Sequence, residues 1–458
     1  MNDKAFKTYD IRGRVPDELN EELAYKIGCA FANEFAARKV VVGMDVRTTS
    51  PALLQAVLDG LCAAGCDGIN IGLCGTEEVY FATSFLDADG GIMVTASHNP
   101  EDYNGMKFVK KNSAAVSADT GLNAIKERVF SDDFSTVDDA ERGSVTEINV
   151  RADYVEHLLS YISPADLSPL QLVVNPGNGC AGPALDRLQA KLPFTFIPLQ
   201  YTPDGTFPNG IPNPLLPENR QVTAEAVKAH SADMGIAWDG DFDRCFFYDE
   251  KGRFIEGYYI VALLAESMLA KHSGAKIIHD PRLEWATRSI VTEKGGQPIR
   301  SKTGHALIKE CMRREDAVYG GEMSAHHYFR DFFYCDSGMV PWLLVTELVS
   351  KSGKKLSELV DAMIEAYPVS GEINRILSDP ALAIQAVAES YLPDSIANDT
   401  LDGISMDMGQ WRFNLRSSNT EPVVRLNVES RGDKKLMEEK TDEILSILEQ
   451  YRVEESSK

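Results

Sequence analysis

The feature that most constrains the fold of this chain is an alternation of short apolar segments with amphipathic ones. Residues 40–43 form an apolar run that predicts a buried strand, and residues 51–64 follow with leucines at helical spacing. Further apolar runs bounded by glycine occur at residues 69–72 and 91–95. This alternation is typical of α/β layers with a parallel or mixed sheet, so we expect units of that kind.

The length of 458 residues suggests about three domains, with four possible, and the alternation favours four modules. Three α/β units are expected at residues 1–151, 152–252 and 253–368, and the third ends in a long helical pattern over residues 338–367. Residues 369–458 differ, with strands around 373–377, 411–415 and 423–428 and then a charged helix. The last module is therefore expected to be a smaller α+β domain.

Charge and composition exclude several classes of protein. The net charge is −23, and such a surface repels the phosphate backbone of nucleic acids. A site for a phosphorylated metabolite would need a metal ion or converging Arg and Lys side chains. No run of about 18 apolar residues predicts a membrane span, and the N-terminus lacks a secretory signal. The eight cysteines include no C-x-x-C pair, so we expect reduced, structural thiols in a cytoplasmic protein.

An acidic segment, residues 238–244, is the strongest motif. It follows an apolar strand and carries Asp239, Asp241 and Asp243. Side chains two apart in extended chain point the same way, so these three carboxylates are expected to converge. Carboxylates this close raise one another's pKa unless a cation lies among them, and oxygen ligands without His or Cys suit Mg²⁺.

A calcium-binding loop is the main alternative reading of this segment. Glu250 lies at position twelve counted from Asp239, as such a loop requires. However, position six is Arg244 where that loop needs glycine, and residues 246–248 have the pattern of a strand rather than of an exiting helix. The calcium loop is therefore disfavoured.

The second motif, residues 94–100, places Ser97 just after another apolar strand. Open α/β sheets carry their sites at this edge. His98 is adjacent, but no Gly-x-Ser-x-Gly elbow is present, and neighbouring side chains in extended chain diverge. We therefore expect His98 to be poorly placed as the direct base for Ser97.

Two weaker motifs follow. Glu322 and Ser324 lie at alternate positions after a short strand, where they could bind two vicinal sugar hydroxyls. Arg416 opens the polar segment 416–422, which combines a guanidinium group with hydroxyl and amide groups suited to phosphate. Each motif alone would also fit an ordinary polar turn.

These four segments, with residues 7–13 near the start, resemble in order and separation the bacterial phosphomannomutase/phosphoglucomutase branch of the α-D-phosphohexomutase superfamily. The resemblance covers essentially the whole chain and rests on four independent motifs. It implies four domains around a central cleft, namely three related α/β units with mixed sheets and a smaller α+β C-terminal domain that can rotate.

The resemblance also implies roles for matching positions. The phosphoserine position matches Ser97, which with three aspartates would hold Mg²⁺: Asp239, Asp241 and Asp243. The other implied catalytic residues are Arg12, His98, Lys107, Arg244 and His326. The implied substrate-binding residues are Tyr9, Arg282, His305, Glu322, Ser324, Arg416, Ser418, Asn419 and Thr420.

Two positions depart from the family pattern. The family's sugar loop, which matches residues 321–326, usually reads Gly-Glu-Met-Ser-Gly-His, and here Ala325 replaces the second glycine. Arg282 stands where relatives commonly carry a lysine, which keeps the charge but changes reach and geometry.

The resemblance implies a phosphomannomutase reaction, in which mannose 6-phosphate and mannose 1-phosphate interconvert to supply GDP-mannose synthesis. Phosphate on Ser97 would pass to the substrate, giving a 1,6-bisphosphate that turns over and returns the other phosphate. Mg²⁺ is the implied cofactor and hexose 1,6-bisphosphate the activator. Arg12, His98, Lys107 and His326 are candidate proton carriers.

Other functions compete with this reading. A phosphoglucomutase or a dual-specificity mutase would carry the same motifs, because glucose and mannose phosphates differ only at the C2 hydroxyl. Phosphoglucosamine mutases typically differ at Met323 and Phe242. A metal-dependent phosphatase would use an aspartate nucleophile, and a non-catalytic regulator would bind sugar phosphate without needing Ser97 beside the aspartates.

Overall fold

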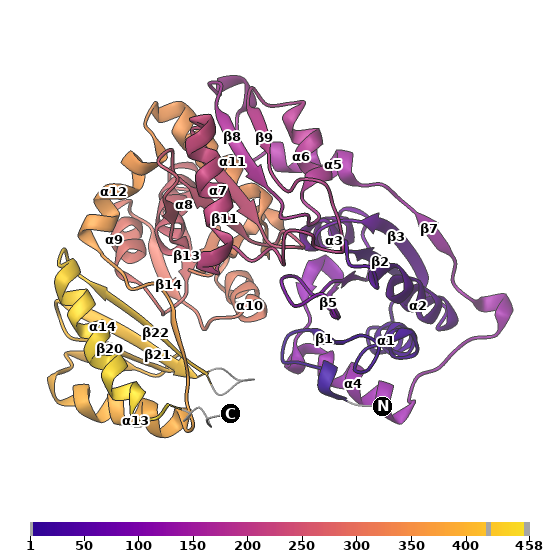
Figure 1. Cartoon of the computed structure of the whole chain (residues 1–458). Helices are drawn as coiled ribbons and strands as arrows, with labels where there is room; N and C mark the ends of the chain where they lie inside the picture. The colour runs from indigo at the N-terminus through magenta and orange to yellow at the C-terminus, as the bar shows by residue number, and fades with distance from the viewer. Residues whose placement is uncertain (1–2, 418–422, 453–458) are drawn as a thin grey trace. The chain divides into compact units, whose positions relative to one another are not determined.

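The computed structural model describes residues 3–417 and 423–452, and Figure 1 labels many of its elements. The chain divides into two compact units. The first comprises residues 1–255, 312–314 and 326–356, and the second comprises residues 256–311, 315–325 and 357–458. Among the described residues, no helix has the length and apolar character needed to cross a membrane.

The N-terminal domain has a mixed sheet with the order β1-β5-β4-β2-β3-β7, and β6 pairs with β5. Helices α1, α2 and α4 cover one face of this sheet, and α3 packs against β2 and β4. The strands are β1 (Ile11–Arg14), β2 (Lys39–Met44), β3 (Asp67–Leu73), β4 (Gly90–Val94), β5 (Tyr103–Lys110), β6 (Ala114–Ala115) and β7 (Val145–Glu147). The helices are α1 (Glu21–Glu34), α2 (Ser50–Ala63), α3 (Thr76–Phe85) and α4 (Leu122–Ser131).

The second domain has the sheet order β12-β11-β10-β8-β9, in which β9, β8 and β10 are parallel and β11 and β12 antiparallel. Its strands are β8 (Gln171–Asn175), β9 (Thr195–Pro198), β10 (Met234–Trp238), β11 (Cys245–Tyr248) and β12 (Phe254–Ile255). Its helices are α5 (Arg151–Leu159), α6 (Gly182–Gln189) and α7 (Gln221–His230). The strand β10 ends directly before the acidic motif.

The third sheet contains the parallel strands β14, β13 and β15 and the antiparallel pair β16 and β17. The strands are β13 (Lys276–His279), β14 (Gln297–Arg300), β15 (Tyr319–Gly321), β16 (His327–Phe329) and β17 (Cys335–Asp336). The helices are α8 (Gly257–Lys271), α9 (Trp285–Glu293), α10 (His305–Glu315), α11 (Met339–Ser352) and α12 (Leu356–Ala366).

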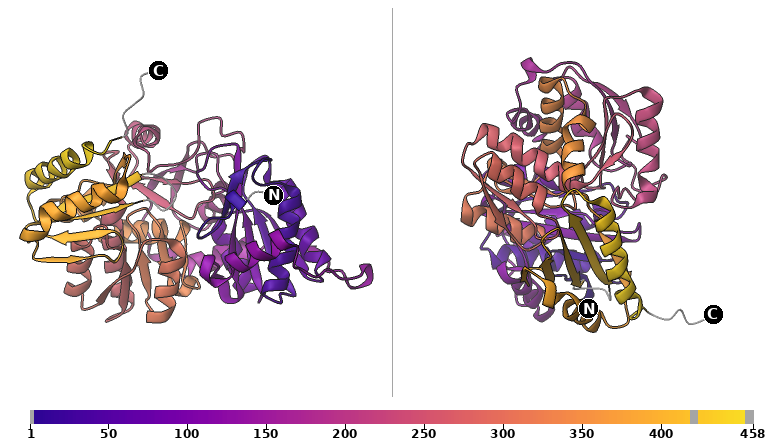
Figure 2. Two further views of the ribbon diagram at one scale, coloured as in Figure 1. Left: turned by 90° about the horizontal axis from the view of Figure 1, so that it is seen from below. Right: turned by 90° about the vertical axis from the view of Figure 1, so that its left-hand side faces the viewer.

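The C-terminal domain has an antiparallel sheet with the order β18-β22-β21-β20-β19. Helices α13 and α14 pack against it over one apolar core (Figure 2). Its strands are β18 (Ile373–Ile376), β19 (Ala397–Asp399), β20 (Ile404–Asp407), β21 (Trp411–Ser417) and β22 (Val423–Ser430). Its helices are α13 (Pro380–Tyr391) and α14 (Lys434–Glu449). Three mixed α/β sheets and one smaller α+β domain confirm the expected fold class.

The structure differs from the sequence-based expectations at two places. The helical pattern over residues 338–367 is two helices, because Gly353 adopts φ +67° and ends α11. The inner strand β5 was not predicted. It contains Gly105, where a Cβ would lie 2.1 Å from the carbonyl oxygen of Ile11, so glycine is needed for the close approach of β1.

Candidate active site

The serine motif forms the nucleophile loop, residues 95–103, which runs from the end of β4 to the first residue of β5. Ser97 is 2% exposed, and its Oγ donates to Asp239 Oδ2 at 2.8 Å. Its backbone has φ +48°, in the left-handed region that L-residues rarely adopt. Ser97 is therefore held in a strained conformation that aims its hydroxyl at the acidic motif.

The expectation that His98 is poorly placed beside Ser97 is wrong. His98 Nδ1 lies 2.9 Å from Ser97 Oγ. The expectation assumed extended backbone, whereas the left-handed φ of Ser97 turns the two neighbouring side chains together. Burial, with Arg244 and Arg12 nearby, lowers the pKa of His98 well below its usual value, so the imidazole is neutral.

The three aspartates converge as predicted, though by another route. Ligand oxygens of Asp239, Asp241 and Asp243 all lie within 4.8 Å of one another, and all three residues are buried. The segment is a turn rather than extended chain, since Phe242 has φ +44° and its N–H donates to the Asp239 carbonyl. The fully buried ring of Phe242 packs against Gly75, where a Cβ would lie 2.2 Å from it.

This triad fits a divalent cation. Asp241 Oδ1 is buried and has no hydrogen-bond partner among the described residues. Asp241 Oδ2 accepts from Thr76 Oγ1 at 2.5 Å and from Lys107 Nζ at 2.7 Å. Lys107 also donates to Asp243 Oδ2 at 2.5 Å. An all-oxygen donor set with an unpartnered buried carboxylate oxygen suits Mg²⁺, a hard cation that prefers oxygen ligands.

A second group that could hold a metal ion overlaps the triad. It consists of Asp243, His326 and Asp336, whose ligand atoms also lie within 4.8 Å of one another. Because Asp243 belongs to both groups, the two sites share a ligand.

The ionisable side chains in this cluster have pKa values shifted in different directions. Burial, followed by repulsion from Asp243 and Asp241, raises the pKa of Asp239 to about 7. Burial also disfavours ionised Asp243, but Lys107 and His326 outweigh it and hold the pKa of Asp243 well below its usual range. For Lys107, burial opposes the charge, whereas Asp241 and Asp243 outweigh it and raise its pKa.

The raised pKa of Asp239 predicts that Mg²⁺ affinity depends on pH. Below about pH 7 a proton occupies the Asp239 carboxyl in the metal-free protein and competes with the cation. As the pH rises, the affinity for Mg²⁺ should therefore increase by up to about tenfold per pH unit, and it should level off above about pH 7. Calorimetric titration of metal-free protein with Mg²⁺ between about pH 5.5 and about pH 8.5 measures this. Asp239→Asn protein should bind more weakly and lose most of the slope; an equal slope in both proteins would contradict the assignment.

Cationic side chains of the first unit lie around the nucleophile loop and the acidic motif. Arg12 Nη1 donates to Asn99 Oδ1 at 2.5 Å, and its Nε pairs with Asp10 at 2.7 Å. Arg244 Nε donates to His326 Nε2 at 3.2 Å. Tyr9 lies just before β1 and is half-buried. The structure thus brings together Ser97, the aspartates and the following predicted residues: Arg12, His98, Lys107, Arg244 and His326.

The predicted sugar-binding residues lie in the second unit around Arg282. This buried arginine pairs with Asp280 at 2.8 Å and lies 3.6 Å from Glu322 Oε1. Its Nη2 also donates to Ser324 Oγ at 3.3 Å. Glu322 Oε1 accepts from the N–H of Gly304, next to His305 at the start of α10. Arg282 therefore holds both sugar-loop side chains in place.

Glu372 is a site residue that the sequence did not reveal. Its Oε2 lies 3.3 Å from Arg416 Nη2 and 3.2 Å from Arg282 Nη1, and its Oε1 lies 3.6 Å from Arg425. Burial opposes its charge, but Arg282 and Arg416 outweigh it and lower its pKa. A single glutamate before a strand has no motif, so only the fold identifies it. The predicted phosphate-binding residues Ser418, Asn419 and Thr420 lie outside the described residues.

Ala325 has φ +69°, which explains why a glycine would suit this position. Left-handed backbone costs a non-glycine residue about 1 kcal/mol, so Ala325→Gly should raise stability by somewhat less than that, on the order of 0.5 kcal/mol, after the added chain entropy. Because the sugar loop relaxes, KM for the hexose phosphate should also change. Thermal unfolding and steady-state kinetics measure both effects.

Ala36→Gly provides the matched control for this prediction, because Ala36 has φ +47° in the first unit, at the end of α1. This variant should gain similar stability with unchanged kinetics. If Ala325→Gly lowers stability, the strain assigned to Ala325 is refuted.

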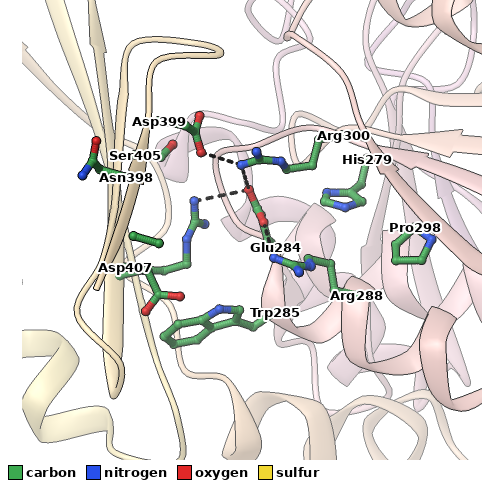
Figure 3. Close-up of a pocket in the computed structure, with 12 residues that line it drawn as sticks. His279, Glu284, Trp285, Arg288, Pro298, Arg300, Asn398, Asp399, Ser405 and Asp407 are labelled. Carbon is green, nitrogen blue, oxygen red and sulfur yellow. Dashed lines mark hydrogen bonds and ion pairs between the residues drawn. The ribbon is translucent and has the colours of Figure 1, made fainter. Parts of the chain in front are cut away.

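A separate cavity of about 390 Å³ lies in the second unit, and Figure 3 shows its lining. Glu284 is central to it and pairs with Arg288 and Arg300, both at 3.1 Å. Arg300 also reaches Asp399 of β19 at 2.6 Å. None of the residues proposed above lines this cavity, so it is not part of the candidate site.

Comparison with known proteins places the chain in a family. Four family models describing phosphoglucomutase/phosphomannomutase match in order: α/β/α domain I at residues 3–136, domain II at 152–252, domain III at 256–367 and the C-terminal domain at 372–446. A phosphomannomutase of Salmonella montevideo is 60% identical over 97% of this chain and 98% of its own length. The chain belongs to the phosphoglucomutase/phosphomannomutase family.

Further relatives carry two kinds of name. A phosphomannomutase of Escherichia coli K12 is 58% identical over 97% of this chain and 98% of its own length. A protein named phosphohexose mutases, from Xanthomonas campestris pv. campestris, is 59% identical over 97% of this chain and 99% of its own length. A crystal structure of a phosphoglucomutase/phosphomannomutase family protein from Burkholderia thailandensis superposes with a TM-score of 0.88, at 34% identity and 98% coverage of both chains.

Proposed function

We propose that this chain is a phosphomannomutase that interconverts mannose 6-phosphate and mannose 1-phosphate through phosphate carried on Ser97. The observation that carries the proposal is the 2.8 Å contact of Ser97 Oγ with Asp239, inside three buried aspartates. A protein that only bound sugar phosphate would not need a serine hydroxyl against clustered carboxylates. This arrangement instead suits transfer of a phosphoryl group beside a cation.

Different residues have different tasks in this reaction. Arg416 binds the phosphate of the incoming hexose phosphate, while Glu322 and Ser324 bind its ring hydroxyls. Mg²⁺, when held by the three aspartates, neutralises charge that develops on the transferring phosphoryl group. Hexose 1,6-bisphosphate acts as activator because it rephosphorylates Ser97 when the serine phosphate is lost.

In the first transfer, the free hydroxyl of the bound sugar attacks the phosphorus of phosphoserine. The bond from phosphorus to Ser97 Oγ breaks as the new oxygen–phosphorus bond forms, and the sugar hydroxyl loses its proton to a neighbouring base. The proton given up by the sugar hydroxyl ends on Ser97 Oγ, which becomes a hydroxyl again. When phosphate returns to Ser97, the neutral imidazole of His98, whose Nδ1 lies 2.9 Å from Oγ, is in place to take that proton. The 1,6-bisphosphate then turns over, and its other phosphate returns to Ser97 by the reverse chemistry.

Mannose is the proposed substrate because relatives at 58–60% identity are named phosphomannomutase, and the product would supply GDP-mannose synthesis. A dual-specificity phosphohexomutase is the second candidate, since relatives at 59% identity are named phosphohexose mutases. The identified sugar readers, Glu322 and Ser324, are not expected at C2, where mannose and glucose differ.

A parallel mutase assay on mannose 1-phosphate and glucose 1-phosphate, with Mg²⁺ and a trace of glucose 1,6-bisphosphate, tests the proposal. A clear preference for mannose 1-phosphate would support the phosphomannomutase. Equal rates would favour the dual-specificity enzyme. Release of free phosphate instead of either 6-phosphate would overturn the mutase and favour a phosphatase with an aspartate nucleophile.

A further inference from the structure

A buried arginine outside the predicted site holds the nucleophile loop through hydrogen bonds. Arg47 follows β2, is 1% exposed, and donates to four backbone carbonyl oxygens of that loop. Nη2 donates to Ser97 at 3.0 Å and to Asn99 at 2.6 Å. Nη1 donates to Pro100 at 2.6 Å and to Tyr103 at 2.9 Å. One planar guanidinium group thus satisfies four carbonyls that the loop turns inward.

The guanidinium group is itself fixed from two sides. Its Nε lies 3.4 Å from Asp45 Oδ2, and the same carboxylate oxygen accepts from the N–H of Ala96 at 3.3 Å. The ring of Phe207, from the second domain, lies 5.4 Å from Arg47 Cζ, within the range of a cation–π contact. Arg47 therefore has little freedom to move relative to the loop that it holds.

The contact to the Ser97 carbonyl matters most, because Ser97 has the left-handed backbone described above. A strained backbone conformation persists only where several surrounding contacts hold it in place. On its other side, the same carbonyl oxygen faces Gly240 of the acidic motif, where a Cβ would lie only 2.7 Å from it. Arg47 and Gly240 together set how closely the serine approaches the aspartates.

We infer that Arg47 is the positioning residue of the nucleophile loop, holding Ser97 Oγ where it exchanges phosphate beside the aspartates. This inference rests on the proposed function, in which Ser97 carries the phosphate. A lysine in this place keeps the charge, but its single ammonium group cannot reproduce the planar fork of donors. Displacement of a reacting group by about 1 Å can cost about 100-fold in rate.

The test compares Arg47→Lys with wild type under the mutase assay. We expect kcat to fall by about 100-fold with KM for the sugar phosphate unchanged, because Arg416, Glu322 and Ser324, which are proposed to bind it, lie in the second unit. Phosphorylation of Ser97 by glucose 1,6-bisphosphate, followed by intact-mass measurement in a single turnover, should slow by the same factor. If Arg47 had only a structural role, a lower kcat with unchanged KM and an equally slower phosphorylation of Ser97 would not be expected together.

Arg151→Lys is the matched control, since Arg151 is a mostly buried arginine of the same unit that pairs with Glu78 at 2.8 Å and donates to the Leu73 carbonyl. It should leave phosphorylation of Ser97 unchanged. Equal rates of Ser97 phosphorylation in wild type and Arg47→Lys would overturn the inference. An equal loss of that rate in Arg47→Lys and Arg151→Lys would also overturn it. If wild type itself never carries phosphate on Ser97, the proposed function fails instead.

A second variant keeps the inference testable if Arg47→Lys does not fold. Phe207→Leu leaves Arg47 and the whole nucleophile loop intact but removes the ring that supports the guanidinium group. It should slow phosphorylation of Ser97 several-fold, with KM unchanged. A wild-type phosphorylation rate in folded Phe207→Leu protein, when Arg47→Lys is unfolded, would also overturn the inference.

Discussion

Ser97→Ala protein is expected to lose mutase turnover by a factor on the order of 10⁴ to 10⁶, the range seen when a covalent nucleophile is removed. The substitution deletes Ser97 Oγ, the oxygen proposed to carry the phosphate, which contacts both Asp239 and His98. Intact-mass measurement after incubation with glucose 1,6-bisphosphate should show a phosphate adduct on wild type and none on the variant.

Ser267→Ala is a suitable control for this experiment, because Ser267 is a buried serine of α8 in the second unit. It should keep both turnover and the phosphate adduct. Near-normal mutase activity in Ser97→Ala protein would refute the phosphoserine mechanism, and a phosphate adduct that survives in that variant would place the phosphate on another residue.

Asp241→Asn protein is expected to bind Mg²⁺ at least about 100-fold more weakly, because even changes to groups that only support a ligand cost 10- to 100-fold. Asp241 Oδ2 already accepts from Thr76 and Lys107, so the amide oxygen of an asparagine would face those donors. Its NH₂ group would then replace the buried Oδ1 and present hydrogen atoms to the cation. Calorimetric titration with Mg²⁺ measures the loss, and turnover at fixed Mg²⁺ should fall with it.

Asp249→Asn tests whether such a loss is specific. Asp249 is also a buried aspartate of the second domain, but it pairs with Arg253 rather than joining the triad. Its substitution should lower stability while leaving Mg²⁺ affinity unchanged. Wild-type Mg²⁺ affinity in Asp241→Asn protein would remove Asp241 from the metal site.

Glu372 neutralises a cluster of three arginines in the second unit. Its carboxylate lies against Arg282, Arg416 and Arg425, which would otherwise repel one another in a partly buried place. Because the same guanidinium of Arg416 is proposed to bind the substrate phosphate, Glu372 holds it in place through an ion pair before substrate arrives. Neither Arg425 nor Glu372 belongs to a motif that the sequence displays.

Local patterns in the sequence determined the order of strands and helices and the four polar segments. Residues 238–244 and 94–100 each follow an apolar strand, and strand ends meet at one edge of a sheet, so Ser97 and the aspartates could be predicted as site residues. This prediction was possible because each segment contains its own signal within a few residues.

Tertiary structure decided the geometry within and between these segments. Lys107 and Asp241 are 134 residues apart and form an ion pair at 2.7 Å, and Arg47 reaches the Ser97 carbonyl across 50 residues. The left-handed backbone of Ser97, which overturned the expectation for His98, and that of Phe242 are stabilised by such distant contacts rather than by local preference. Local sequence thus specified the chemical groups that lie in the four motifs. Only the packing of distant segments added Glu372 and fixed conformation and charge state, because burial and ion pairing depend on neighbours that the folded chain brings together.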